Sequence, residues 1–108
     1  LINNAGVALD KFVPSGDLDV DVLRETLETN VVGAFKVTQA MMPLLSRSEH
    51  GRIVNVSSQL GALSIMGGTI LAYRMSKAAL NALTRVTAAA LPPGPAVPAR
   101  CLHTAKTP

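Results

Sequence analysis

Tyr73 and Lys77 are the residues of this sequence whose types and spacing best suit proton chemistry. They lie four residues apart in a segment rich in alanine and leucine, Ala72 to Ala82 (A-Y-R-M-S-K-A-A-L-N-A). If this segment is helical, the spacing places both side chains on one face. A nearby ammonium stabilises a phenolate, so such a pair can exchange a proton with a bound molecule. The same spacing also arises by accident in helices, so the pair gains meaning only from its surroundings.

The composition limits the class of protein. A chain of 108 residues is long enough for one small domain. No apolar run approaches the ~20 residues that span a bilayer, and no secretory signal is visible. The single cysteine, Cys101, excludes an internal disulfide and fits a reducing compartment, so we expect a cytoplasmic protein. His50, His103 and Cys101 lack the spacing of metal ligands, and no metal site is predicted.

The charged residues are unevenly distributed along the chain. All seven acidic residues lie between Asp10 and Glu49, and the chain is basic from His50 onward. The basic residues are scattered and have no aromatic residues between them, so we do not expect binding to nucleic acid.

The order of the predicted elements indicates an α/β fold with a parallel sheet. L-I-N-N-A-G (residues 1–6) is typical of a buried strand that enters a loop. Apolar residues at spacings of three and four predict a long helix over residues 20–45, with an N-cap at Asp17 or Asp19. R-I-V-N-V-S-S (residues 52–58) predicts a second strand, and residues 71–91 predict a second long helix. The intervening residues 59–70 are expected to form a loop whose apolar residues make either a substrate wall or the internal packing of a long loop; they are Leu60, Leu63, Ile65 and Met66.

Polar residues end both predicted strands. Asn3 and Asn4 follow the first strand, and Ser57 and Ser58 end the second. Ligands of parallel sheets bind outside the carboxyl ends of the strands, so we expect these side chains to share one ligand-binding edge. Within the first helix, Asn30 and Gly33 should weaken it locally and Pro43 should kink it.

Four motifs stand in one order, L-I-N-N-A-G, T-N-V-V-G, I-V-N-V-S-S and Y-R-M-S-K. With these separations, residues 1–91 resemble the catalytic region of the short-chain dehydrogenases/reductases, in their classical, carbonyl-reductase-like branch. The resemblance implies an NAD(P)-dependent oxidoreductase that transfers hydride between a nicotinamide and a carbonyl or alcohol substrate, with NADP slightly favoured over NAD. It also implies that the two long helices pair in a homo-oligomer of the complete protein.

The resemblance further implies a role for each matching residue. Tyr73 would be the general acid or base, and Lys77 would stabilise its phenolate and hold the nicotinamide ribose. Ser58 would hydrogen-bond the reacting oxygen. Asn30 would order a water that links Lys77 to solvent. The residues expected near the adenosine side of the cofactor are Asn4, Ala5 and Gly6.

The sequence departs from the family pattern at both ends. The glycine-rich turn that cradles the pyrophosphate is missing, and residues 92–108 contain four closely spaced prolines where a sixth strand is expected. We therefore expect a partial Rossmann-like doubly wound sheet, a βαβα fragment without its N-terminal nucleotide-binding half. Residues 92–108 should be a disordered, proline-rich tail, which we interpret as the product of a shifted reading frame. The alternative function is a non-catalytic fragment that at most self-associates, whereas four motifs in register disfavour an unrelated binding module.

Overall fold

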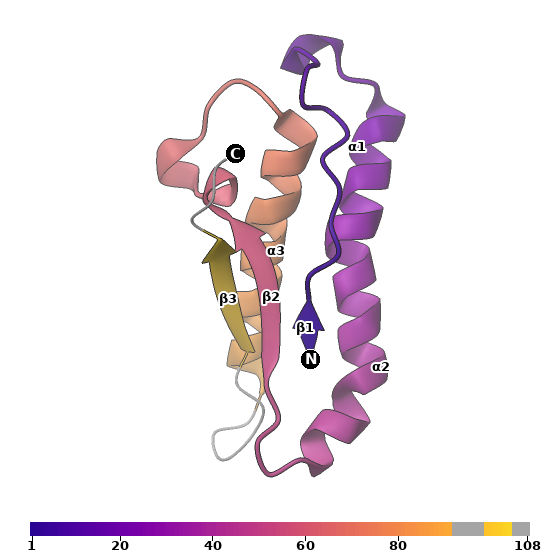
Figure 1. The fold of residues 1–108 in the computed structure, drawn as a ribbon, viewed down its shortest axis with the longest axis vertical. Helices are drawn as coiled ribbons and strands as arrows, with labels where there is room; N and C mark the ends of the chain where they lie inside the picture. The colour runs from indigo at the N-terminus through magenta and orange to yellow at the C-terminus, as the bar shows by residue number, and fades with distance from the viewer. Residues whose placement is uncertain (92–98, 105–108) are drawn as a thin grey trace.

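Three parallel strands form the sheet, in the order β1-β2-β3 (Figure 1). The computed structural model describes residues 1–91 and 99–104, and for the second range the backbone alone. The strands are β1 (Ile2–Asn3), β2 (Ile53–Ser58) and β3 (Ala99–Thr104). The predicted α/β class with a parallel sheet is confirmed.

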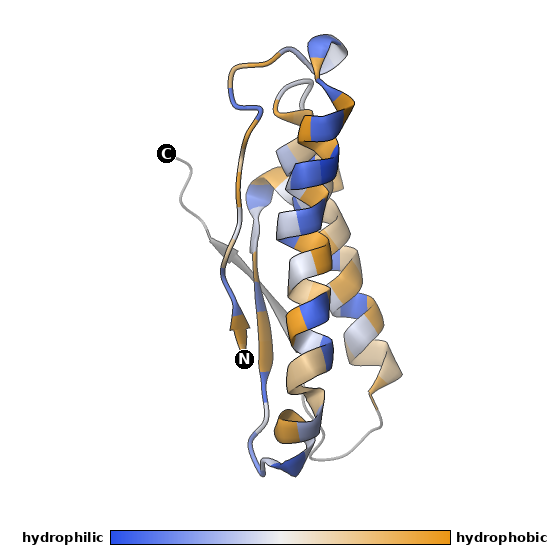
Figure 2. Cartoon of the chain, turned by 90° about the vertical axis from the view of Figure 1, so that its right-hand side faces the viewer, coloured by the Kyte–Doolittle hydropathy of each residue, from blue (hydrophilic) through white to orange (hydrophobic). Residues whose placement is uncertain are grey.

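Helices fill both connections between the strands, and they lie on one face of the sheet (Figure 2). The first connection contains α1 (Val20–Leu27), a π-helical turn (Glu28–Val32) and α2 (Gly33–Arg47). The second contains α3 (Leu71–Ala90). Short 3-10 turns occupy Ser15–Asp17, Gln59–Gly61 and Leu63–Ile65. Of the two predicted caps of the first helix, Asp19 is the one used, because its Oδ1 accepts from the amide of Asp21 at 2.8 Å.

The prediction that the segment after Leu91 forms no strand is wrong for Ala99–Thr104. This stretch pairs along the whole of β2, from Ile53 beside Ala99 to Ser58 beside Thr104. The prolines before it misled the prediction, since a proline can directly precede a strand. The free edge of β2 supplies the ladder partners that the composition of the segment does not reveal. Residues 92–98 and 105–108, also predicted to be disordered, lie outside the described residues.

The side chains of β2 that face the helices change in character along the strand. At its start, Ile53 packs with Leu45 in a small apolar core, beside partly buried Leu1, Met41, Met42 and Leu91. At its middle, Asn55 is 2% exposed, and towards its end Ser57 is equally buried. The interior is therefore apolar at the amino ends of the strands and polar towards their carboxyl ends.

A chain of buried hydrogen bonds crosses the middle of the sheet. Asn3 Nδ2 donates to Thr38 Oγ1 of α2 at 3.1 Å and to Asn55 Oδ1 at 2.8 Å. Asn55 Nδ2 donates to Thr84 Oγ1 of α3 at 2.9 Å. Asn3 therefore serves this network, and the expectation that it lies at the ligand-binding edge is wrong. Asn4, the residue after β1, is exposed and takes no part in this network.

No helix in residues 1–91 is long and apolar enough to cross a membrane. In the same part of the chain, no group of three or more His, Cys, Asp or Glu residues is placed to hold a metal ion.

We predict that Asn55→Ala destabilises the fold by about 1–3 kcal/mol, because Asn3 and Thr84 each lose a buried hydrogen-bond partner. Urea unfolding followed by circular dichroism measures the change. Asn4→Ala is the matched control, since Asn4 is exposed and its replacement should change stability by less than about 0.5 kcal/mol. Equal unfolding midpoints for the two variants would show that the network adds nothing to stability.

Candidate active site

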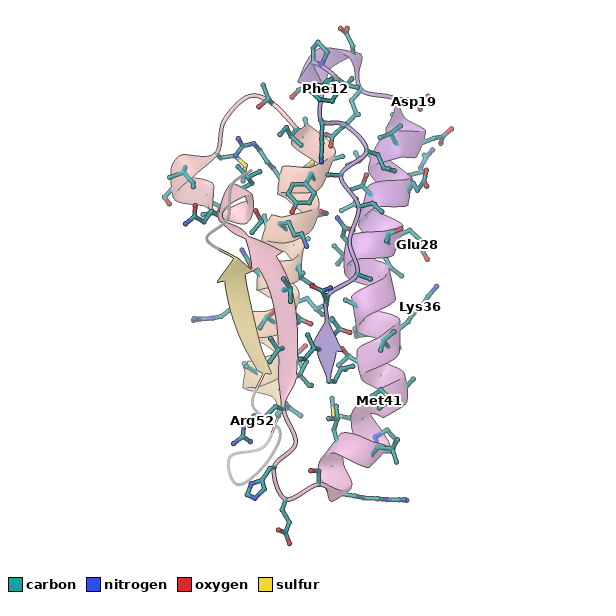
Figure 3. All side chains as sticks on the ribbon, in the orientation of Figure 1. Phe12, Asp19, Glu28, Lys36, Met41 and Arg52 are labelled. Carbon is teal, nitrogen blue, oxygen red and sulfur yellow. The ribbon has the colours of Figure 1, made fainter. Side chains whose placement is uncertain are left out.

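A cavity of about 630 Å³ opens at the carboxyl ends of β1 and β2. The loop after β1, the end of β2 and the first turns of α3 line it. Phe12 of that loop lies at the end of the molecule towards which the strands point, and Arg52 lies at the opposite end (Figure 3). The strands thus bring together segments that are far apart in sequence, at the edge where parallel sheets bind ligands.

Tyr73 and Lys77 both line this cavity from α3. The Lys77 ammonium lies 5.6 Å from the centroid of the Tyr73 ring, within the range of a cation–π contact. It also donates to the main-chain oxygen of Val56 in β2 at 3.0 Å. Lys77 is only 5% exposed, so its charge acts in a site where water screens it weakly.

The two serines that end β2 have different surroundings. Ser57 is buried, and its hydroxyl donates to the main-chain oxygen of Lys77 at 3.3 Å. Ser58 is half-buried and lines the cavity, and its Oγ accepts from the amide of Leu60 at 3.2 Å. Both serines line the cavity, and Ser57 also helps to fix β2 against α3.

Asn30 is 1% exposed and lies behind the cavity wall. Its Oδ1 accepts from the amide of Val7 at 2.7 Å, and its Nδ2 donates to Val7 O at 2.8 Å. The same Nδ2 donates to Ser76 Oγ of α3 at 2.9 Å. The side chain therefore fastens the loop after β1 to α3, a contact that the predicted water-ordering role does not include.

Gly6 packs directly against the two buried polar groups. A Cβ at this position would lie 3.3 Å from Asn30 Oδ1 and 3.4 Å from Lys77 Nζ. Glycine thus brings the main chain of the loop close to both side chains and leaves space on the cavity side. Of the other two residues predicted beside the cofactor, Asn4 lines the cavity, whereas Ala5 is exposed and is not part of its lining.

Comparison with known proteins now identifies the family. The family model for short chain dehydrogenases matches residues 1–103. The chain belongs to this family. The predicted resemblance is confirmed, and it extends beyond residue 91 into β3.

Relatives of known name show how much of a family member is present. C-signal of Myxococcus xanthus is 42% identical over 79% of this chain and 51% of its own length. The NADP-dependent 3-hydroxy acid dehydrogenase of Schizosaccharomyces pombe is 40% identical over 78% of this chain and 31% of its own. Among solved structures, NADPH-bound carbonyl reductase from chicken fatty liver superposes with a TM-score of 0.79 at 28% identity, over 94% of this chain and 43% of that one. This short chain dehydrogenase sequence thus spans at most about half of these proteins.

Other residues of the cavity gave no signal in the sequence. Lys11 and Phe12 line its mouth from the loop after β1, which the sequence marks only as irregular. Of the apolar residues predicted to line the cavity from the loop before α3, Leu60 does so, whereas Leu63 is 80% exposed and lies outside the lining. Among the described residues, no acidic side chain lines the cavity, and its two lysines make it electropositive.

We predict that Gly61→Ala disrupts the candidate active site of this short chain dehydrogenase by displacing α3. Its Cβ would lie 2.7 Å from the main-chain carbon of Lys77 and 2.9 Å from the amide nitrogen of Ala78. Backbone atoms cannot rotate away from such contacts, so α3 must shift, at a cost of about 1–3 kcal/mol.

Urea unfolding and the amide NMR shifts of Lys77 and Ala78 measure this effect. Gly68→Ala is the control, because a Cβ at Gly68 meets nothing within 4 Å. A Gly61→Ala protein with the shifts and stability of the Gly68→Ala protein would contradict the prediction.

Proposed function

We propose that the cavity is the proton-transfer part of an NAD(P)-dependent oxidoreductase site that interconverts a carbonyl compound and its alcohol. The observation that carries this proposal is the meeting of Tyr73, Lys77 and Ser58 in one cavity. The three come from a helix and a strand end that are joined by a buried contact between Ser57 and Lys77. Membership of the short chain dehydrogenase family supports the same reaction class.

In this proposal each side chain acts on the substrate oxygen or on its proton. Tyr73 donates its phenolic proton to the carbonyl oxygen during reduction and accepts the proton of the alcohol during oxidation. Ser58 donates a hydrogen bond to the same oxygen and stabilises the negative charge that develops on it. Lys77 favours the phenolate that Tyr73 forms when it gives up its proton. Asn30 acts through position, since it holds the cavity loop against α3.

The residues present suit the nicotinamide half of the cofactor. Gly6 lines the cavity, and Lys77 offers a cation that can donate to ribose hydroxyls. We propose that Tyr73 and Lys77 contact this half of the cofactor, and that Asn4 and Gly6, with Ala5 adjacent, lie near its adenosine side. When bound, the cofactor supplies or takes up the hydride at the substrate carbon. NADP is favoured because two of the matched proteins carry NADP or NADPH in their names.

The cavity mouth and the outer helix faces suggest the partners. Phe12 is 96% exposed beside Lys11, so we propose a small substrate with an apolar part. Apolar side chains that remain exposed on α2 and α3 suit a second copy of the chain in a homo-oligomer; they are Phe35, Val37, Leu44, Met75 and Val86.

The test is titration of NADPH into the 108-residue chain, followed through the fluorescence of the nucleotide. We expect saturable binding that Lys77→Met weakens and Tyr73→Phe retains. In any turnover of a carbonyl compound, Tyr73→Phe should lower the rate by about 100- to 10,000-fold, because a positioned acid contributes that much.

Lys36→Met is the control for Lys77→Met, because Lys36 is exposed on α2 and pairs only with Glu28 in the contacts that the structure describes. Circular dichroism checks that each variant is folded. A folded chain that binds no nucleotide would favour the alternative of a non-catalytic, self-associating segment.

A further inference from the structure

Asp10 is a buried carboxylate that none of the proposed catalytic roles uses. It is 1% exposed and does not line the cavity. Its Oδ2 accepts from the amide of Ala72 at 2.7 Å, across 62 positions of the sequence. Ala72 is the second residue of α3 and directly precedes Tyr73. A residue of the loop after β1 therefore caps the helix that carries the proposed acid.

The start of α3 cannot be capped locally. The residue at the N-cap position is Ile70, whose side chain has no hydrogen-bond acceptor. The first amides of a helix have no partner within the helix, so an acceptor must come from elsewhere. Asp10 supplies it, and its negative charge suits the positive end of the helix dipole.

Ile70 also has a backbone conformation that is unfavourable for isoleucine. Its φ of 56° and ψ of 50° lie in the left-handed region, where a β-branched residue is strained. Such strain persists only where the surroundings impose it. The loop after β1 provides these surroundings, through Asp10 on Ala72, through Ser15 Oγ donating to Gly68 O at 2.8 Å, and through a bridge between Pro14 and Thr69.

The burial of Asp10 is only partly compensated. Its second oxygen, Oδ1, is buried and has no hydrogen-bond partner among the described residues. A buried polar atom without a partner costs stability.

We propose that Asp10 is a positioning residue that fixes the start of α3, and thereby the place of Tyr73 in the cavity. Ile70 and Tyr73 line the cavity on either side of the capped amide. Loss of the cap would release the strain at Ile70 by rotating the first turn, and Tyr73 would move with that turn. The effect on turnover rests on the proposed function, whereas the effect on the position of Tyr73 does not.

The chain offers a direct probe of this position, because Tyr73 is its single tyrosine and tryptophan is absent. Intrinsic fluorescence therefore reports on Tyr73, and its quenching by acrylamide measures how accessible the ring is. The variants are Asp10→Ala, which removes the acceptor, and Asp10→Asn, which keeps an acceptor oxygen in a side chain of the same shape. Asp17→Ala is the control, since Asp17 is exposed in a nearby turn.

We expect Asp10→Ala to increase quenching several-fold and to shift the amide resonance of Ala72, with helix content retained. Asp10→Asn and Asp17→Ala should match the parent chain in both measurements. If the chain reduces carbonyl compounds, Asp10→Ala should lower kcat by up to about 100-fold with little change in KM, since misplacement of a catalytic group by about 1 Å costs that much.

The proposal is overturned if folded Asp10→Ala protein shows the parent's quenching and Ala72 shift. If Asp10→Ala does not fold, Asp10→Asn decides: a folded Asn variant in which the Ala72 amide shift changes but the quenching of Tyr73 does not would overturn the proposal. Absence of nucleotide binding in the parent chain would refute the proposed function through a separate readout and leave the quenching result to stand alone.

Discussion

The side-chain amide of Asn30 joins three parts of the molecule that the chain itself does not connect. It lies in the π-helical turn between α1 and α2, and it binds the loop after β1 at Val7 and α3 at Ser76. An asparagine inside a helix competes for the backbone hydrogen bonds of the helix, so regular helix geometry is lost at this point. The gain is a buried amide whose two donors and one acceptor hold the cavity wall together. Gly6 can pack against Lys77 only because this contact brings the loop and α3 together.

The interior of the fold combines a small apolar core with a network of side-chain hydrogen bonds. In the part of the chain whose side chains are described, an apolar cluster lies around Leu45 and Ile53, whereas hydrogen bonds run from Thr38 through Asn3 and Asn55 to Thr84. Satisfied polar networks add little net stability, but they penalise every arrangement that leaves a member unpaired. This network fixes the register of β1 on β2 and the positions of α2 and α3 along the strands. The polar end of the sheet borders the cavity.

Short-range patterns were sufficient to predict that Tyr73, Lys77 and Ser58 meet at one edge of the sheet. Tyr73 and Lys77 share a helix face, and Ser58 ends a strand, so their spacing alone brings them to one edge. The sequence contains no comparable pattern that predicts the contacts between distant segments. The cap that Asp10 provides depends on the folded path of its loop, and Ile70 gives no sign in the sequence of its left-handed conformation. β3 was missed because its partner, the edge of β2, is a property of the sheet and not of residues 99–104.

Two side chains, those of Asn30 and Asp10, hold the loop after β1 by hydrogen bonds, and they divide the cavity wall into two parts. Asn30 holds the loop at Val7, and Asp10 holds it on α3 three residues later. Hydrogen bonds therefore hold the loop on both sides of Ala8 and Leu9, beside the helix turn that carries Tyr73. After Asp10, Lys11 and Phe12 line the mouth of the cavity with side chains that are exposed to solvent. Lys11 and Phe12 are exposed, so these two positions can vary while Tyr73 and Lys77, the proposed proton-transfer groups, stay in place.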